Sequence, residues 1–289
     1  MGKRMMETAV QQIMLGTVLK NEKQAEETLR LIREAGYDGI ELNGFMIRPS
    51  GMLVRLLTKF AGMPTGACGK FDWKTLMKAS GLQVVSIHED LGMIRNHSEE
   101  VIREAEDFGT DRIVVTGMYR FDYSDPAAVK KLAEDLNSCG KRLKGGGVRL
   151  LYHNHNCELL RLKDESRCTA YDYIIDNTDP DYVNFEFDSY WMTDGGANVP
   201  ALMTKLGSRM KLWHINDRGA RVSGPQMTPI LQYDSMELGY GCMDLDALTA
   251  IAKENGTETV ILESHRNWIE KSPLKSLKLS SEYLNRTFH

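Results

Sequence analysis

The feature of this chain that most constrains its fold is a regular alternation of short apolar runs with longer amphipathic segments. The apolar runs are brief and mostly rich in Val, Ile or Leu, which is typical of strands buried on both faces. We expect eight such strands, at Gln12–Gly16, Gly39–Leu42, Gln83–His88, Arg112–Thr116, Arg149–His153, Val183–Asp188, Met210–Ile215 and Thr259–Glu263.

The segments between these runs have the spacing of amphipathic helices. In Glu22–Ala35 the apolar residues recur on one helical face, and Gly36 follows as a helix stop. The stretch between Asn43 and Ser80 is expected to hold two helices, with a loop around Pro64–Gly69. Further helices are expected at Ser98–Phe108, Pro126–Leu143, Ala170–Asn177, Val199–Leu206, Leu245–Asn255 and Pro273–Leu284.

Strands that alternate with helices predict parallel pairing through right-handed crossovers. A closed barrel and an open doubly wound sheet both satisfy this pattern. No G-x-G-x-x-G follows the first strand, which argues against a dinucleotide-binding open sheet. We expect one (β/α)8 barrel domain over residues 1–289, because polar residues end the strands, where a barrel builds its active site.

Composition restricts the classes of partner. The chain has 289 residues and a formal net charge of -4, which argues against a general nucleic-acid or membrane-surface binder. Its five cysteines include no C-x-x-C pair, so neither a disulfide framework nor a structural zinc site is expected. We see no signal peptide and no apolar run long enough to span a membrane. We expect a cytoplasmic protein with a small-molecule substrate, and leave a homo-oligomer open.

Residues that can bind a metal or move a proton end most of the expected strands. They are Glu41, His88, His153, His155, Asp188, His214, Asp217 and Glu263. The C-terminal strand ends of a barrel converge on one mouth, so these side chains would meet there. A lone histidine or carboxylate at such a position is more often structural, but this number of them favours a shared site.

The chemistry of such a site follows from its residue types. Imidazoles mixed with carboxylates suit Mn2+, Zn2+, Co2+ or Fe2+ better than Ca2+. An ion with open positions would let a substrate diol or hydroxy-ketone chelate it, which polarises the carbonyl and stabilises an enediolate. A nearby carboxylate or imidazole would take the proton from the adjacent carbon. The residues therefore predict metal-assisted chemistry on a sugar or other polyol.

Four strings carry a family resemblance. YHNHNCE at Tyr152–Glu158, FEFDSYW at Phe185–Trp191, LWHINDR at Leu212–Arg218 and VILES at Val260–Ser264 occur in this order. With them, the chain resembles the sugar isomerase/epimerase superfamily of xylose-isomerase-like TIM barrels. That group includes ketose 3-epimerases, inosose dehydratase and endonuclease IV-like proteins. The resemblance covers nearly the whole chain and implies the same barrel.

The resemblance also implies a metal held at the ends of strands five to eight. Matched motif by motif, the ligands would be His153, Asp188, His214 and Glu263. Mn2+ is the first expectation, with Zn2+, Co2+, Fe2+ or Mg2+ as alternatives. Many epimerases of this group have Glu where this chain has His153. That departure lowers the negative charge of the set by one and would shift the preference towards Zn2+ or Fe2+.

Further roles are implied around the ion. In ketose 3-epimerases two glutamates act on opposite faces of the substrate, so Glu158 and Glu263 are the expected catalytic pair, with His88 beside them. Substrate contacts are expected from Glu41, Trp191, Asp217, Arg218 and His265. Glu41 could equally support neighbouring residues instead of contacting the substrate. Asp217 and Arg218 could equally form an ion pair within their loop.

Two functions lead. The first is a metal-dependent sugar isomerase or epimerase that removes the proton alpha to a carbonyl through an enediolate. The second is a lyase or dehydratase on a keto-inositol or 3-keto-glycoside; Trp191 favours it, because ketose 3-epimerases commonly have His at that position. An endonuclease IV-like repair enzyme fits the acidic balance poorly. A non-catalytic partner subunit is a further alternative, because His153 stands where many epimerases have Glu.

Overall fold

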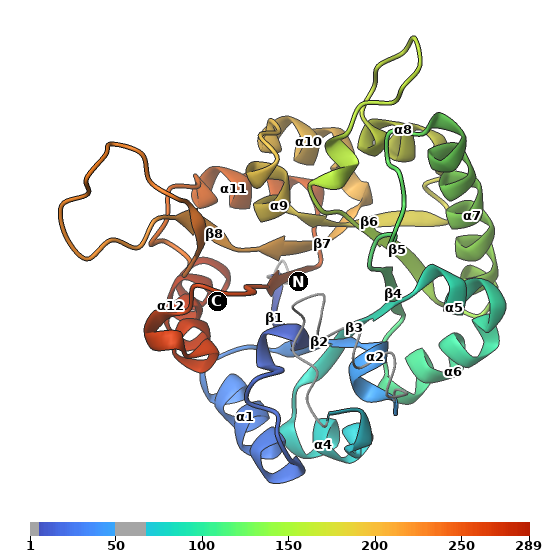
Figure 1. Ribbon diagram of the computed structural model, residues 1–289. Helices are drawn as coiled ribbons and strands as arrows, with labels where there is room; N and C mark the ends of the chain where they lie inside the picture. Colours follow the sequence, from blue (N-terminus) through green and yellow to red (C-terminus); the bar gives the residue numbers. More distant parts are fainter. Residues whose placement is uncertain (1–5, 50–67) are drawn as a thin grey trace. The chain divides into compact units, whose positions relative to one another are not determined.

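The computed structural model describes residues 6–49 and 68–289. Eight of its strands form a closed barrel in the order β1-β10-β7-β6-β5-β4-β3-β2, which confirms the predicted fold class (Figure 1). These strands are β1 Glu7–Gln11, β2 Gly39–Asn43, β3 Gln83–Glu89, β4 Arg112–Val115, β5 Arg149–His153, β6 Val183–Asp188, β7 Met210–Ile215 and β10 Thr259–Leu262. A separate antiparallel pair joins β8 Asp217–Gly219 to β9 Asp234–Met236.

Helices follow the strands along the chain. The α-helices are α1 Glu22–Glu34, α2 Gly44–Ile47, α4 Trp73–Ser80, α5 Leu91–Asn96, α6 Ser98–Phe108, α7 Pro126–Gly145, α8 Ala170–Asn177, α9 Ser189–Asp194, α10 Val199–Leu206, α11 Leu245–Asn255 and α12 Pro273–Phe288. Short 3-10 turns are η1 Gln12–Leu15, η2 Cys68–Lys70, η3 Cys157–Leu159, η4 Gly207–Arg209 and η5 Ile269–Lys271. None of these described helices is both long and apolar enough to cross a membrane.

Seven of the eight predicted strands agree with the structure to within one residue, and the first does not. The strand is β1 at Glu7–Gln11, whereas the predicted run Gln12–Gly16 mostly forms the buried turn η1. The Gln11 side chain accepts the Ile13 N–H at 2.8 Å, which caps this turn where the strand ends. The buried turn η1 is as apolar as a buried strand would be. The hydrophobic pattern therefore placed the first strand over this turn.

Between Asn43 and Ser80 the structure describes α2 and α4, and most of the predicted loop at Pro64–Gly69 lies outside the described residues. Asp72 begins α4 by accepting the Thr75 N–H at 3.1 Å. Gly81 ends it in the left-handed conformation, with φ of 69°. Helix α7 is bounded in the same way by an N-cap, Asp125, followed by proline at the first helical position.

The chain divides into two compact units. One comprises the described parts of residues 1–83, 214–250 and 259–289. In its core, Val10 of β1 pairs with Ile40 of β2 and with Leu262 of β10, and all three side chains are buried. The Tyr37 hydroxyl donates to the Leu277 carbonyl of α12 at 2.9 Å, which ties this helix to the strands.

The other unit comprises residues 84–213 and 251–258, with β3 to β6 in parallel register. An ion-pair network joins its strand beginnings. Arg149, which begins β5, donates to both oxygens of Asp111 at 2.9 and 3.0 Å and to Glu258 at 2.8 Å. Arg112, which begins β4, donates to Glu258 at 2.8 Å. These residues fix the ends of the strands opposite to the polar strand ends.

We expect Glu258→Gln to lower the free energy of unfolding by about 1 kcal/mol at neutral pH. Burial alone would raise the pKa of Glu258, but Arg149, Arg112 and Lys211 hold it below its usual value. The contribution is therefore present above the unfolded pKa of about 4.3 and is lost as pH falls through the lower folded value. Denaturant unfolding of both proteins across pH measures this difference. A difference that does not shrink in acid would contradict the charge explanation, and Glu134→Gln on the exposed face of α7 serves as control.

Candidate metal centre

The strand register gathers three polar strand-end residues within the second unit. His153 of β5 pairs directly with Glu186 of β6. Side chains alternate along a strand, so Glu186 and Asp188 point to the same face. His153 Nδ1 lies 3.0 Å from Glu186 Oε2, and His88 Nε2 lies 2.8 Å from the same oxygen. All four side chains are buried. Sequence reasoning missed Glu186, although its position two residues before Asp188 was a usable signal.

One carboxylate oxygen therefore faces two imidazoles. An ionised carboxylate only accepts hydrogen bonds, so both facing nitrogens carry the hydrogen. This fixes the tautomer of His153, whose Nε2 then presents a lone pair. His88 Nδ1 lies 3.2 Å from the Thr116 hydroxyl and can accept its hydrogen. The pairing with Glu186 thus orients both histidines before any ligand arrives.

A similar arrangement occurs in the first unit around His214, which lies near the end of β7. Its Nε2 lies 2.6 Å from Glu41 Oε2, and its Nδ1 lies 3.1 Å from Glu263 Oε2. Burial favours the neutral form of Glu263, but His265 and His214 outweigh it and hold its pKa well below the usual range. Glu263 is therefore an ionised carboxylate at neutral pH.

The predicted ligands come together. The ligand atoms of His153, Asp188, His214 and Glu263 all lie within 4.8 Å of one another, and these residues are buried. A second set satisfies the same condition and consists of His88, His153, Glu186 and His214. Two imidazoles with two carboxylates form a donor set that fits a divalent transition metal. This buried cluster can bind a divalent metal ion.

Each histidine of the predicted set has a carboxylate on its other nitrogen. Glu186 Oε2 is within hydrogen-bond distance of His153 Nδ1, and Glu41 Oε2 is within hydrogen-bond distance of His214 Nε2. Such carboxylate–histidine pairs fix the ring orientation and raise the basicity of the nitrogen that faces a metal. Glu41 therefore supports His214, which favours the supporting role over a direct substrate contact.

We expect Glu186→Gln and Glu41→Gln each to weaken metal affinity by roughly 10–100-fold without unfolding the protein. A glutamine keeps the shape but not the charge that holds the imidazole hydrogen. Competition with a chromophoric chelator measures the affinity. The control is Glu100→Gln, which removes an exposed carboxylate 3.3 Å from His97. If all three variants bound metal as tightly as the wild type, the two buried pairs would have no part in metal binding.

Asp188 is held in place by local structure. It is the N-cap of α9, where Oδ1 accepts the Trp191 N–H at 2.8 Å. Its own N–H donates to the Asn154 side chain at 3.0 Å. These bonds orient the carboxylate at the point where β6 becomes a helix.

Glu158 has hydrogen-bond donors on both of its carboxylate oxygens. It is fully buried in η3, where Oε1 accepts from the Tyr152 hydroxyl at 2.8 Å. Its Oε2 accepts from the His155 N–H at 3.0 Å and from the Cys157 thiol at 3.2 Å. Three donors on one carboxylate fix the turn that follows β5. The expected role of Glu158 as a base stays a prediction.

Asp217 is likewise occupied by backbone. Its two oxygens accept the N–H groups of Arg218, Gly239, Gly241 and Met243, at 2.8 to 3.1 Å. It organises the loop before α11, and its expected substrate contact stays a prediction. The guanidinium of Arg218 lies 5.5 Å from the ring centroid of Tyr233, and its expected roles, a substrate contact or an ion pair within the loop, stay predictions.

Two predicted substrate contacts stay predictions. The half-buried Trp191 ring lies 5.9 Å from the ring of His155, which in turn lies 4.8 Å from that of His153. His265 is exposed, and its Nε2 lies 3.5 Å from Glu263 Oε2. Their positions are compatible with contact to a substrate beside the cluster.

Known proteins share this fold. Residues 29–287 match the family described as xylose isomerase-like TIM barrel. The inosose dehydratase of Mesomycoplasma hyopneumoniae is 22% identical over 90% of this chain and 87% of its own. A sugar phosphate isomerase/epimerase from Parabacteroides distasonis is 19% identical, with a TM-score of 0.76 over 100% of this chain and 97% of its own. The IOLI protein, solved with a bound zinc atom, is 16% identical, with a TM-score of 0.63 over 98% of both chains.

The family match spans most of the chain. This protein therefore belongs to the xylose isomerase-like TIM barrel family.

Proposed function

We propose that this chain is a divalent-metal-dependent lyase of the dehydratase type that acts on a keto-inositol or a related keto-sugar. The observation that carries the proposal is the buried cluster of His153, Asp188, His214 and Glu263, whose donor atoms lie within 4.8 Å of one another. A metal held there would polarise the substrate carbonyl and stabilise the enediolate. This cluster supports Zn2+, Mn2+, Co2+ or Fe2+ over Ca2+.

The chain's own residues would move the protons. Glu263 is ionised at neutral pH and takes the proton alpha to the carbonyl. In its protonated form His88 would deliver a proton from Nδ1, the nitrogen that lies 3.2 Å from the Thr116 hydroxyl, to the hydroxyl beta to that carbonyl, whose C–O bond breaks, and water leaves. The bond electrons released at the alpha carbon form the new C=C bond. Glu186, 2.8 Å from His88 Nε2, stabilises the protonated imidazole that this step requires.

The choice of elimination over epimerisation rests on Glu158. A two-base epimerase needs a second base on the opposite face of the substrate, and Glu158 was the expected one. Its oxygens are bound by Tyr152, the His155 N–H and Cys157. Trp191 also replaces the histidine expected of ketose 3-epimerases. One base with one acid suffices for loss of water. The similarity to inosose dehydratase supports the same choice.

An epimerase is the second candidate, because one similar solved structure is described as a sugar phosphate isomerase/epimerase. Both reactions share the enediolate and differ only in the fate of that intermediate. Incubation of the metal-loaded protein with keto-inositols and keto-sugars in D2O separates them by mass spectrometry. A dehydratase gives a product lighter by one water, whereas an epimerase gives an isomer that has gained deuterium. Neither product, at full metal occupancy and across a broad substrate panel, would contradict the proposal.

A further inference from the structure

A fully buried glutamine side chain lies where the first strand of the barrel ends. Gln12 follows β1 and begins the turn η1. Its Oε1 accepts the Asn43 N–H at 2.8 Å. Among residues 6–49 and 68–289, its Nε2 has no hydrogen-bond partner. Buried polar groups in native proteins are nearly always paired, because an unpaired donor lowers stability. We therefore expect this amide to meet an acceptor from outside the chain.

The orientation of the Gln12 amide is fixed by its neighbours. If the amide were reversed, its NH2 group would face the Asn43 N–H, and two donors would meet. Asn43 is itself held, because its side chain donates to Gln11 Oε1 at 2.7 Å. The same Gln11 oxygen accepts the Ile13 N–H at 2.8 Å. Gln12 therefore presents its two Nε2 hydrogens from a fixed position.

The strand register places Gln12 beside two carboxylates of the candidate metal centre. Gln11 pairs with Glu41 of β2. On its other side β1 pairs with β10 up to the residues just before Gln11 and Glu263, so these two residues are level with each other. Gln12 therefore lies one residue beyond the level of Glu41 and Glu263, towards the C-terminal ends of the strands. Active sites of (β/α)8 barrels are built at these ends.

We propose that Gln12 binds the substrate through a hydrogen bond from Nε2 to a hydroxyl oxygen that the metal does not hold. This inference rests on the proposed function, because it concerns the polyol ring of that same site. Two adjacent substrate oxygens would bind the metal, and Glu263 is the proposed base. Gln12, one residue beyond the level of Glu263, binds the oxygen of a further ring carbon. This contact fixes the rotation of the ring about the metal and so places the reacting carbon at the base.

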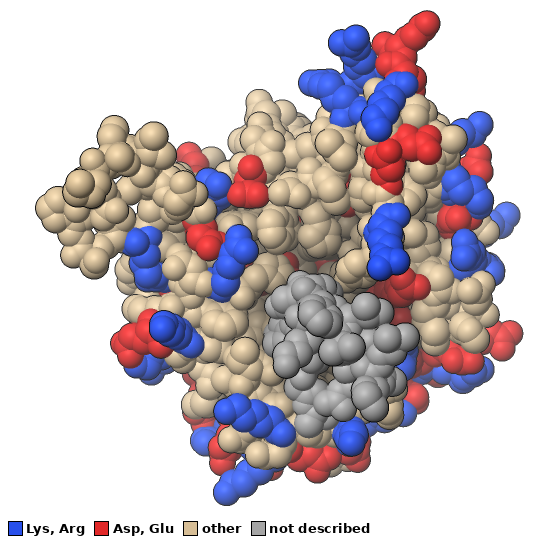
Figure 2. Space-filling model, in the orientation of Figure 1, with Lys and Arg blue, Asp and Glu red and all other residues tan. Residues whose placement is uncertain are grey.

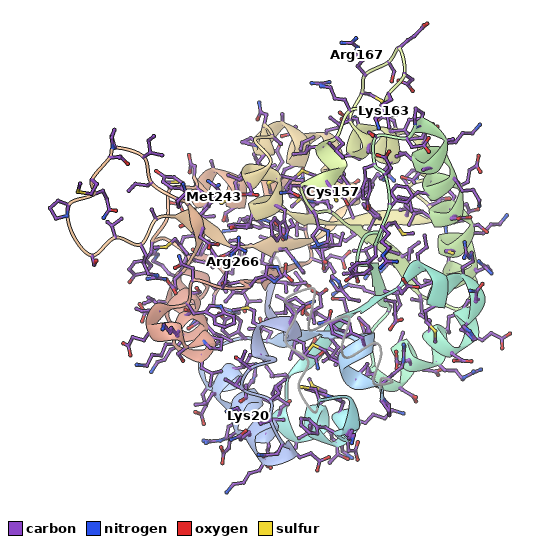
Figure 3. The ribbon with its side chains drawn as sticks, in the orientation of Figure 1. Lys20, Cys157, Lys163, Arg167, Met243 and Arg266 are labelled. Atoms are coloured by element: carbon purple, nitrogen blue, oxygen red, sulfur yellow. The ribbon has the colours of Figure 1, made fainter. Side chains whose placement is uncertain are left out.

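The donor favours an unphosphorylated polyol. Proteins hold phosphate groups with cations, and with arginine above all. Figure 2 shows acidic side chains beside many of the Lys and Arg residues on the face that it draws. In the unit that contains Gln12, Arg266 (labelled in Figure 3) donates to Asp234 at 2.9 Å, and Arg221 donates to Glu237. These two cations are already neutralised, whereas the uncharged amide of Gln12 suits a hydroxyl oxygen.

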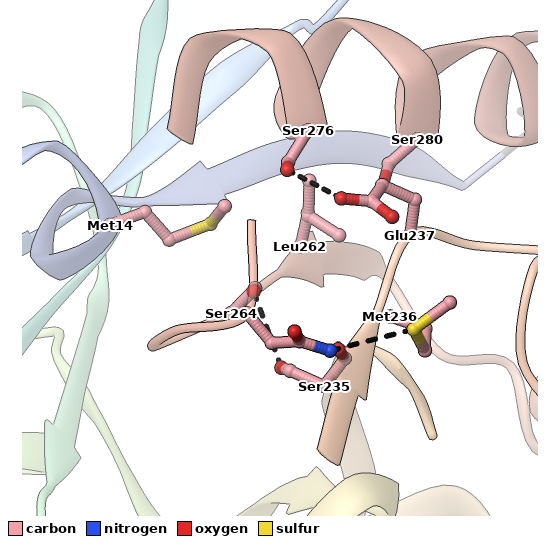
Figure 4. A pocket seen from close by; sticks show the side chains of 9 residues that line it. Met14, Ser235, Met236, Glu237, Leu262, Ser264, Ser276 and Ser280 are labelled. Atoms are coloured by element: carbon pink, nitrogen blue, oxygen red, sulfur yellow. Dashed lines mark hydrogen bonds between the residues drawn. The ribbon is translucent and has the colours of Figure 1, made fainter. Parts of the chain in front are cut away.

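A pocket in the same unit provides a contrast. It is lined by Met14 of η1 and by polar residues that include Glu237 and Ser276 (Figure 4). Glu237 Oε1 accepts from the Ser276 hydroxyl at 2.5 Å and from the Ile269 N–H at 3.1 Å. The polar groups of this pocket therefore satisfy one another and require no ligand, unlike the Nε2 group of Gln12.

Proton–nitrogen NMR of the zinc-loaded full chain tests the contact directly, with myo-inositol as an unreactive probe. The side-chain amide signal of Gln12 is assigned sequentially on the wild type, so no variant has to fold. We expect this signal to shift when inositol is added, and to stay in place with the monodeoxy-inositol that lacks the bound hydroxyl. The Gln11 amide, already bound to Asn43, is the internal control and should shift less. An unchanged Gln12 signal at saturating inositol, or no binding of inositol, would overturn the assignment.

Calorimetry on Gln12→Met measures the energetic consequence. This variant should bind inositol about tenfold more weakly than the wild type, with unchanged metal content, because one hydrogen bond is lost. It should also bind inositol and the same monodeoxy derivative equally, whereas the wild type should prefer inositol. Gln226→Met, which replaces an exposed glutamine, is the control and should bind like the wild type. A Gln12→Met variant that keeps the preference of the wild type would overturn the assignment.

The product of the reaction distinguishes this inference from the proposed function. An isomer in place of a dehydrated product, with the Gln12 signal still shifted by inositol, would contradict the dehydratase and leave the Gln12 contact supported. A dehydrated product formed by Gln12→Met with the kcat/KM of the wild type would support the dehydratase and overturn the role of Gln12.

Discussion

Asp188→Asn is expected to lower turnover by at least roughly 100-fold, since even residues that only support metal ligands change affinity or activity by 10–100-fold. Asparagine offers a neutral oxygen where a carboxylate would hold the ion. It also preserves the N-cap of α9, because asparagine caps helices as well as aspartate does. The loss should therefore come from the site and not from unfolding.

The measurement is steady-state kinetics with metal content on the same sample. Asp125→Asn is the control, because Asp125 is the N-cap of α7 and has no place in the cluster. It should keep both activity and metal. Undiminished activity in Asp188→Asn would remove Asp188 from the ligand set.

His88→Gln is expected to slow catalysis by about 10²–10⁴-fold, the usual contribution of a positioned acid or base, while metal content stays near that of the wild type. The reason is the contact of His88 with Glu186 and Thr116, which holds it as a proton carrier. Glutamine can keep one of these hydrogen bonds but cannot exchange a proton at neutral pH.

The comparison of kinetics with metal content decides the role of His88. His88 also belongs to the second possible ligand set, with His153, Glu186 and His214. Loss of metal together with activity would make His88 a ligand and contradict its role as an acid. The exposed His97, replaced by Gln, provides a control that should change neither quantity.

The pattern of apolar runs predicted the barrel, and the family resemblance implied the four expected metal ligands that the structure clusters. Seven strands are short apolar runs, and the polar residues at or beside the ends of four of them, His153, Asp188, His214 and Glu263, have ligand atoms within 4.8 Å of one another. The first strand was misplaced because the turn η1 is as apolar as a strand. The predicted extent of one domain over residues 1–289 stays a prediction, as do the cytoplasmic location and the identity of the metal.

Side-chain roles were harder to predict than positions. Glu158 and Glu186 both lie near strand ends, yet Glu158 binds Tyr152 and backbone whereas Glu186 binds His153 and His88. No pattern in the sequence separates these two outcomes, because they depend on which donors the folded neighbours present. Asp217 shows the same limit, since three of the four N–H groups that donate to it come from a loop that meets it only in the folded chain.

We propose that His153, Asp188, His214 and Glu263 hold one divalent metal ion. Elemental mass spectrometry of the wild type and of His214→Gln, each after reconstitution and removal of loose metal, measures this occupancy. We expect about one ion per chain in the wild type and a clear loss in the variant. A wild type with less than about a tenth of an ion per chain, or equal content in both proteins, would contradict it.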